Sequence, residues 1–133
     1  MPPDTPPSEA SASPVRVLLV DDNVDAVESM QILLEAFGYA SAIAVHPNIA
    51  LELVESFEPT VAVIDIGLPG MDGYELAVEI RRRRDDAGKP VPRLIALTGY
   101  GGAEDIARAT QAGFASHLVK PVEIEKLLAV LAA

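Results

Sequence analysis

The chain has 133 residues, half of them hydrophobic, and no cysteine. This size and apolar content indicate one folded domain, and the absence of thiols excludes disulfides, thiolate metal sites and a cysteine nucleophile. The 20 acidic and 10 basic residues give a formal net charge of -10, which argues against direct nucleic-acid binding and leaves room for a cation or a basic partner.

The first 14 residues, MPPDTPPSEASASP, are rich in Pro, Ser and Ala. They hold too few apolar side chains to order themselves, so we predict a flexible tail or linker over residues 1–14 and a single domain over residues 15–133. No apolar run is long enough to span a membrane, and the N-terminus lacks the pattern of a signal sequence. We therefore expect a soluble cytoplasmic protein without membrane insertion.

Five short apolar segments predict buried strands, and helical patterns alternate with them. The strands are expected at residues 15–20, 40–45, 61–64, 94–97 and 116–119. The first helix follows the first strand, and Gly38 lies where its C-terminal cap belongs. Residues at helical spacing predict the core face of this helix: Val27, Met30, Leu34 and Phe37.

Capping and breaking residues delimit the other helices. Pro47 suits the first turn of the second helix and Pro59 stops it, while Asp72 can cap the third with its side chain. The basic run at residues 81–84 ends the third helix and is expected to be solvated. The fourth helix is expected between Gly101-Gly102 and Gly113, and the last begins at about Glu123.

This order of elements predicts the fold class. Strands that alternate with helices through short connections indicate an α/β protein, with a parallel sheet wound on both faces by helices. In such sheets, ligands bind at the carboxyl ends of the strands. The residues that directly follow the predicted strands are therefore the candidates for a functional site.

Polar side chains follow four of the five strands. Asp21 and Asp22 follow the first, Asp65 ends the third within VAVIDIGLPGMDG, Thr98 follows the fourth and Lys120 the fifth. Taken singly, Asp21, Asp22 and Asn23 could cap a helix and Asp65 could be a turn residue. Because all five fall at one edge of the sheet, the combination favours a functional site.

Three clustered carboxylates repel one another, and a divalent cation relieves that repulsion. The ligands on offer are hard oxygens, which indicates Mg²⁺ or Mn²⁺. Asp22, Asp65 and a backbone carbonyl such as that of Gly67 could hold the ion, with Asp21 acting through a water. Asp65 could then attack phosphorus and form an aspartyl phosphate. The Lys120 ammonium and the Thr98 hydroxyl could meet the phosphoryl oxygens.

The set Asp21-Asp22, Asp65 within DIGLPGMDG, Thr98-Gly99 and Lys120-Pro121 resembles the receiver domain of two-component response regulators. The resemblance covers residues 15 to about 131. It implies a flavodoxin-like (βα)5 fold with strand order 2-1-3-4-5. It also implies that Asp65 takes a phosphoryl group from a phosphohistidine on a histidine kinase or a histidine phosphotransfer domain. In the resemblance, the three aspartates hold Mg²⁺, Thr98 and Lys120 contact the phosphate, and the Lys120–Pro121 bond is cis.

Two further features bear on context and switching. VDDN, ALTGYG and AGF…HLVKP look especially like receivers of hybrid sensor kinases, so the chain is expected to be a stand-alone receiver or the C-terminal receiver of a hybrid kinase with residues 1–14 as linker. In much of the family an aromatic residue stands three positions before the lysine and moves inward with the threonine. His117 stands there in this chain, and its imidazole is smaller and polar, so this position departs from the family pattern. His117 is either a switch residue together with Thr98 or an ordinary strand histidine. The resemblance places the responding surface on helix four, strand five and helix five.

Two other functions remain open at this point. The first is a scaffold of the same fold that binds partners without being phosphorylated, although a scaffold has no need of three clustered carboxylates. The second is a phosphatase that works through an aspartyl phosphate. Such enzymes commonly carry a second Asp two residues after the nucleophile as general acid, and Gly67 stands at that position.

Overall fold

A computed structural model describes residues 15–67, 72–99 and 103–132. The predicted tail over residues 1–14 and the helix start at Gly101-Gly102 lie outside these ranges.

Five parallel strands form one sheet in the order β2-β1-β3-β4-β5. The strands are β1 (Arg16–Val20), β2 (Ala40–Ala44), β3 (Val61–Asp65), β4 (Arg93–Thr98) and β5 (Ser116–Val119). All five predicted strands are present, and each differs from its predicted range by two residues or fewer. The predicted α/β class and the strand order implied by the resemblance are confirmed.

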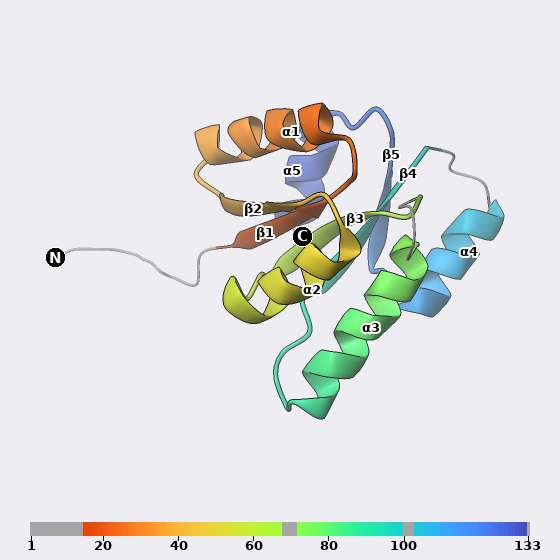
Figure 1. Cartoon of the computed structure of the whole chain (residues 1–133). Helices are drawn as coiled ribbons and strands as arrows, with labels where there is room; N and C mark the ends of the chain where they lie inside the picture. The colour runs from red at the N-terminus through yellow and green to blue at the C-terminus, as the bar shows by residue number, and fades with distance from the viewer. Residues whose placement is uncertain (1–14, 68–71, 100–102, 133) are drawn as a thin grey trace, which may run out of the picture.

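Helices cover both faces of the sheet (Figure 1). They are α1 (Val24–Ala36), α2 (Pro47–Ser56), α3 (Gly73–Asp86), α4 (Ala103–Ala112) and α5 (Ile124–Ala132). Alternate strand residues point to opposite faces, so the core has two halves. Leu18 and Ile64 pack with α2, α3 and α4, whereas Leu19 and Val63 pack with α1 and α5. This layering leaves the carboxyl ends of the central strands together at one edge of the sheet.

Side-chain caps fix the helix starts on the side of the candidate site. Asp72 accepts a hydrogen bond from the backbone N–H of Glu75 at 2.9 Å, and the Glu75 side chain accepts one from the backbone N–H of Asp72 at 3.1 Å. This capping box confirms the predicted start of α3. At the far end of α1, Gly38 has a φ of +89°, the left-handed conformation that glycine adopts most readily after a helix.

Two side chains lie elsewhere than the sequence predicted. Phe37, expected on the core face of α1, is 58% exposed because it is the C-cap, where the chain leaves the helix. Arg84, expected to be solvated with the rest of residues 81–84, is 4% exposed. Its Nε donates to the carbonyl of Pro90 at 3.1 Å, and its Nη1 lies 3.6 Å from a Glu55 carboxylate oxygen. The turn after α3 folds over this arginine and buries it.

Every helix in the described ranges is too short or too polar to cross a lipid bilayer.

Candidate phosphoacceptor site

The strand ends bring the predicted carboxylates together. Asp21 directly follows β1, Asp65 is the last residue of β3, and both are buried, whereas Asp22 is exposed. One carboxylate oxygen from each of the three residues lies within 4.8 Å of the others. β1 and β3 are neighbours in the sheet, so the crossover at this point places two strand ends side by side.

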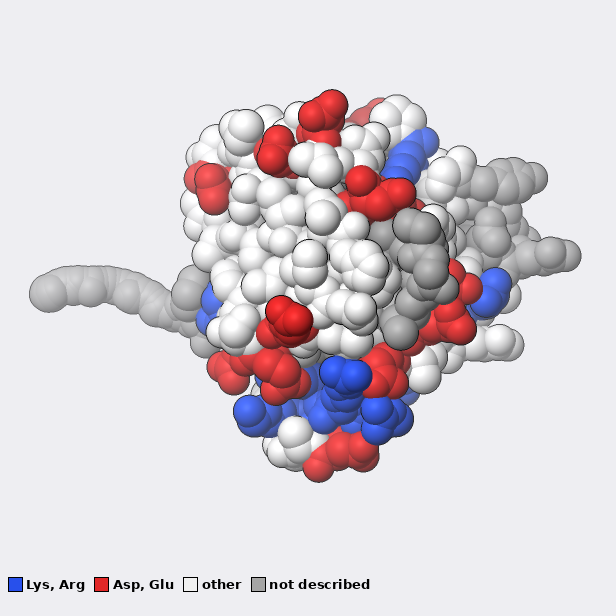
Figure 2. Space-filling view, in the orientation of Figure 1, with Lys and Arg blue, Asp and Glu red and all other residues white. Residues whose placement is uncertain are grey.

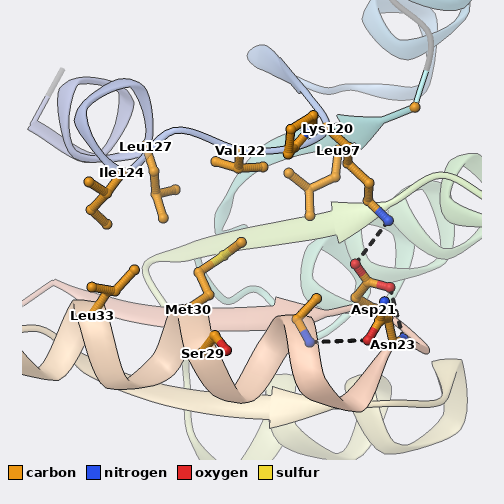
Figure 3. A pocket seen from close by; sticks show the side chains of 13 residues that line it. Asp21, Asn23, Ser29, Met30, Leu33, Leu97, Lys120, Val122, Ile124 and Leu127 are labelled. Atoms are coloured by element: carbon orange, nitrogen blue, oxygen red, sulfur yellow. Dashed lines mark hydrogen bonds and ion pairs between the residues drawn. The ribbon is translucent and has the colours of Figure 1, made fainter.

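Lys120 completes the cluster from the loop after β5. Its Nζ lies 2.9 Å from Asp21 Oδ2 and 3.0 Å from Asp65 Oδ2. The residue is half-buried, so these ion pairs are only partly screened by solvent. Figure 3 shows the lysine reaching from the β5–α5 loop to Asp21 in the β1–α1 loop. One ammonium thus bridges two buried carboxylates from neighbouring strands.

Backbone amides hold the remaining oxygens of both buried aspartates. Asp21 Oδ1 accepts from the N–H of Asn23 at 3.0 Å, and Asp65 Oδ1 accepts from the N–H of Gly67 at 2.9 Å. In each case the donor lies two residues further along the chain, which is the geometry of an Asx turn. Each buried carboxylate therefore has one oxygen fixed by its own loop and the other directed at Lys120.

Asn23 settles whether the first two aspartates act as helix caps. Its side chain oxygen accepts from the N–H of Ala26 at 3.1 Å and caps α1. The sequence allowed capping by Asp21, Asp22 or Asn23, and Asn23 is the residue that caps the helix. Both carboxylates are left for other ligands.

The charges around Lys120 act on its pKa in opposite directions. Partial burial favours the neutral amine, but hydrogen bonds and Coulomb attraction from Asp21 and Asp65 favour the ammonium more strongly. The net result is a pKa of Lys120 above its usual value. The lysine is thus a permanent cation at neutral pH.

The donor set fits a hard divalent cation. The cluster carries three carboxylates and one ammonium, so it keeps an excess of negative charge after the ion pairs are formed. Its ligand atoms are all oxygens, and hard ions such as Mg²⁺ and Mn²⁺ prefer oxygen ligands. The exposed Asp22 gives the cluster a side open to solvent.

The structure places the other predicted residues around this cluster. Thr98 is buried at the end of β4, and its backbone carbonyl accepts from the N–H of Lys120 at 2.8 Å. Gly67 contacts Asp65 through its N–H, while the role of its carbonyl stays a prediction. The Lys120–Pro121 peptide bond is cis. His117 is exposed on β5, outside the carboxylate cluster, and shares with Thr98 and Ile106 a gap too small for a water molecule.

Gly73 is a site residue whose role the sequence did not reveal. A Cβ added to it would lie 2.5 Å from the Cα of Ile66 and 2.7 Å from the carbonyl oxygen of Asp65. Its N–H donates to the Ile66 carbonyl at 3.2 Å. The start of α3 therefore rests directly against the backbone that carries Asp65. An Asp-Gly pair is typical of a turn, and nothing local in the sequence indicates this close approach.

A cavity of about 520 Å³ opens beside the cluster, between α1 and α5 (Figure 3). Met30 and Leu33 of α1 line it on one side, and Val122 and Ile124 line it on the other. Asp21 and Lys120 stand at its polar end. The carboxylate cluster is thus bordered by an apolar hollow.

Comparison with known proteins agrees with this geometry. The profile of the response regulator receiver domain matches residues 17–132. An uncharacterised 14.6 kDa protein of Leptolyngbya boryana is 36% identical over 112 residues, which are 84% of this chain and 83% of that protein. Response regulator MprA of Mycolicibacterium vanbaalenii is 34% identical over 120 residues. That match covers 90% of this chain and 50% of MprA, so the chain spans half the length of that relative.

Solved structures show the same architecture. A CheY-like receiver domain from Methanospirillum hungatei has a TM-score of 0.79 at 31% identity, over 90% of this chain and 92% of that one. The receiver domain of Ssk1 from Saccharomyces cerevisiae, in complex with the histidine phosphotransfer protein Ypd1, is part of a structure with a TM-score of 0.84. It covers 90% of this chain and 87% of that one at 23% identity, which shows the fold alone. With the profile matched over nearly its whole length and an acidic pocket consistent with phosphoacceptor function, the chain belongs to the response regulator receiver family.

Proposed function

We propose that Asp65 accepts a phosphoryl group from a phosphohistidine on a histidine kinase or a histidine phosphotransfer domain. The observation that carries this proposal is the position of Lys120, whose ammonium contacts both Asp21 and Asp65 beside the exposed Asp22. A cation held between two carboxylates can transfer one of its contacts to a phosphoryl oxygen without leaving the site.

The reaction is an attack by a carboxylate oxygen of Asp65 on phosphorus. A P–O bond forms, the P–N bond to the donor imidazole breaks, and the imidazole nitrogen keeps the electron pair and takes up a proton. Lys120 exchanges its contact with Asp65 for a phosphoryl oxygen, and the Thr98 hydroxyl meets another. Positioning and charge neutralisation of this kind account for most of the catalysis in phosphoryl transfer.

The residues that would hold Mg²⁺ or Mn²⁺ are Asp21, Asp22 and Asp65, with the backbone carbonyl of Gly67 as a further ligand. The bound ion supplies positive charge next to the phosphoryl oxygens. The support for this assignment is the all-oxygen donor set and its excess of negative charge.

We assign the conformational response to Thr98 and His117. Both line the closed gap between β4, β5 and α4, so a movement of the threonine toward the phosphoryl group changes the packing around the histidine. Phosphorylation then biases an equilibrium between two conformations. The surface of α4, β5 and α5 reports it.

The partner and the context rest on likeness to other proteins. The solved complex of a receiver domain with a histidine phosphotransfer protein supports a partner of that kind. The sequence motifs VDDN, ALTGYG and AGF…HLVKP support a receiver similar to those of hybrid sensor kinases. A cytoplasmic location stays a prediction.

The test is an amide NMR titration with Mg²⁺ and beryllofluoride, a stable mimic of the phosphoryl group on aspartate. We expect shifts at Asp65, Thr98 and Lys120 only when both are present. Shifts that extend to His117 and α5 would support the proposed switch pair. Incubation with acetyl phosphate and Mg²⁺ should add one phosphoryl group to the intact protein and none to Asp65→Asn.

Asp72→Asn is the matched control, because it removes a carboxylate at the same loop but outside the cluster; it should be phosphorylated normally. Equal phosphorylation of Asp65→Asn and the wild type would refute the assignment. Mg²⁺-independent partner binding that is unaffected by Asp65→Asn would favour the scaffold function. Turnover of small phosphate esters would favour the phosphatase.

A further inference from the structure

The charges of this chain are distributed unevenly. All ten Lys and Arg residues lie outside residues 17–80, whereas 12 of the 20 Asp and Glu residues lie within them. Inside this acidic stretch, residues 37–51 carry no Asp, Glu, Lys or Arg at all. That segment contains β2. Figure 2 looks onto this side of the molecule, where uncharged residues fill the middle and acidic ones line the upper margin over α1.

β2 is an edge strand, and no strand of the described part of the chain pairs with its outer side. It pairs with β1 alone. The N–H and C=O of one strand residue point to the same side, and successive residues alternate. The Ala44 carbonyl accepts from Asp21, so Ala44 faces β1 and Ser41 and Ile43 face outward. The Gln31 side chain donates to the outward Ser41 carbonyl at 3.3 Å, where a neighbouring strand would otherwise donate.

Natural proteins usually protect such an edge with Lys, Pro or a bulge. β2 has the sequence ASAIA and carries none of these. Its small side chains also allow another backbone to approach closely. The edge therefore suits the addition of a strand from a partner.

The α1 side of this edge is acidic. Glu28 and Glu35 lie three residues before and four residues after Gln31, so all three share the face of α1 that borders β2. Both glutamates are exposed, and neither has an ion-pair partner within the described residues.

The α2 side of the edge is apolar. Leu53 packs against the same core cluster as Ala42 of β2. Ile49 lies one turn before Leu53 on α2 and is 40% exposed. Val45, which directly follows β2, is a further exposed apolar residue. The edge of β2 is therefore flanked by acidic side chains on α1 and by apolar side chains on α2.

We propose that the outer edge of β2 binds an extended segment in which Lys or Arg alternates with Val, Ile or Leu. Side chains of a strand point alternately to its two faces, so the basic residues meet Glu28 and Glu35 while the apolar residues meet Ile49 and Leu53. A second copy of this chain fits less well. Two copies joined along β2 would place their acidic α1 helices next to each other.

The probe is a capped ten-residue peptide of alternating Lys and Val, titrated into the ¹⁵N-labelled full chain without Mg²⁺. We expect amide shifts centred on Ser41 and Ile43 and slower hydrogen exchange of these two N–H groups. In a strand, the N–H groups that donate hydrogen bonds to one neighbouring strand come from every second residue. N-methylation of one set should therefore abolish binding, and N-methylation of the other set should leave it intact.

Variants of the protein give a second measurement. Glu28→Gln with Glu35→Gln should weaken binding roughly fivefold, the sum of two partly exposed ion pairs. The matched control, Glu123→Gln with Glu125→Gln at the start of α5, makes the same charge change elsewhere and should change affinity less than twofold. Two results would overturn the proposal. The first is a peptide that still binds when either alternate set of its residues is N-methylated. The second is an equal loss of affinity in both double variants, because the peptide would then be attracted to the acidic protein in general. Asp65→Asn should bind the peptide normally, which keeps this test separate from the phosphoacceptor assignment.

Discussion

Lys120 shows how one side chain can hold an acidic site together. It pairs with two buried carboxylates, and a third lies close by. Replacement by Met keeps much of the aliphatic stem but removes the charge, so the carboxylates then repel each other without compensation. We expect Lys120→Met to lower the free energy of unfolding by about 1 kcal/mol at pH 7, in line with partly exposed charge pairs. Urea denaturation would measure this, and added Mg²⁺ should restore stability more in the variant than in the wild type.

The pH dependence of this effect follows from the raised pKa of Lys120. A group with a higher pKa in the folded state stabilises the fold fully below its unfolded pKa, and the stabilisation is lost as the pH rises through the folded pKa. The stability difference between wild type and Lys120→Met should therefore be constant near neutrality and shrink above pH 10.5, the ordinary value for lysine. Lys126→Met, at an exposed position on α5, should match the wild type at every pH. A constant difference up to pH 12 would contradict this account of the ion pairs.

Gly73 has no side chain, and this allows the backbone of Asp65 and Ile66 to pack directly against the start of α3. Ala has the higher helix propensity, by about 1 kcal/mol, but its Cβ would overlap the backbone of Asp65 and Ile66. We expect Gly73→Ala to destabilise the fold by about 1–3 kcal/mol, as overpacked sites do, and to weaken Mg²⁺ binding because the Asp65 loop must move. Gly99→Ala, where no described residue has an atom within 4 Å of the added Cβ, is the control for stability. A higher free energy of unfolding for Gly73→Ala than for the wild type would show that the Asp65 loop can move away from the added Cβ at little cost.

At the level of the helices and strands, arginine side chains donate hydrogen bonds to backbone carbonyls at or just after the C-terminal ends of helices. Arg16 donates to the carbonyls of Phe57 and Glu58 after α2, at 3.1 and 2.9 Å. Arg81 donates to the Ala112 carbonyl at the end of α4, and Arg93 donates to the Leu131 carbonyl in α5, at 3.1 and 3.2 Å. The last carbonyls of a helix lack partners within the helix, and a cation also suits the negative end of its dipole.

Arg84 gives the sharpest test at this scale. It is the buried member of a run of four arginines, and it joins the end of α3 to the loop before β4. Arg84→Ala should lower the free energy of unfolding by about 2 kcal/mol, because it removes a charged hydrogen bond and buried packing together. Arg83→Ala, exposed on the same helix, should cost less than about 1 kcal/mol. Chemical denaturation of both variants would measure the two losses in the free energy of unfolding. Equal losses would mean that the burial of Arg84 contributes little to stability.

At the scale of the whole molecule, charge repulsion opposes folding. The net charge is -10, and residues 17–80 contain acidic groups without any Lys or Arg. Raising NaCl from about 10 to 150 mM shortens the Debye length from about 30 to 8 Å and screens this repulsion. We expect the Tm to rise by a few degrees, since about 1 kcal/mol corresponds to roughly 4 °C for a domain of this size. Thermal denaturation followed by circular dichroism measures it, and a Tm that falls with NaCl would show that attractive ion pairs dominate.

Local sequence patterns were enough to predict the elements and their order. Short apolar runs defined the strands, and local caps such as Asp72 defined helix starts, because these signals act between residues close in the chain. The same local patterns put Asp21, Asp65, Thr98 and Lys120 at strand ends. Since parallel strands end at one edge of a sheet, those residues could be assigned to one site without coordinates.

The contacts between individual atoms depend on parts of the chain that are distant in sequence. Nothing local to Lys120 indicates that its ammonium bridges Asp21 and Asp65, which are 99 and 55 residues away along the chain. Likewise, the local sequence does not distinguish Arg84 from its exposed neighbours, because the turn at Pro90 is what buries it. The local sequence at Gly73 is typical of a turn, and only the fold packs the Asp65 loop against it. Helical and strand periodicity reports which face of an element turns inward. Contacts between distant elements depend on how those faces pack, and packing is a property of the whole fold.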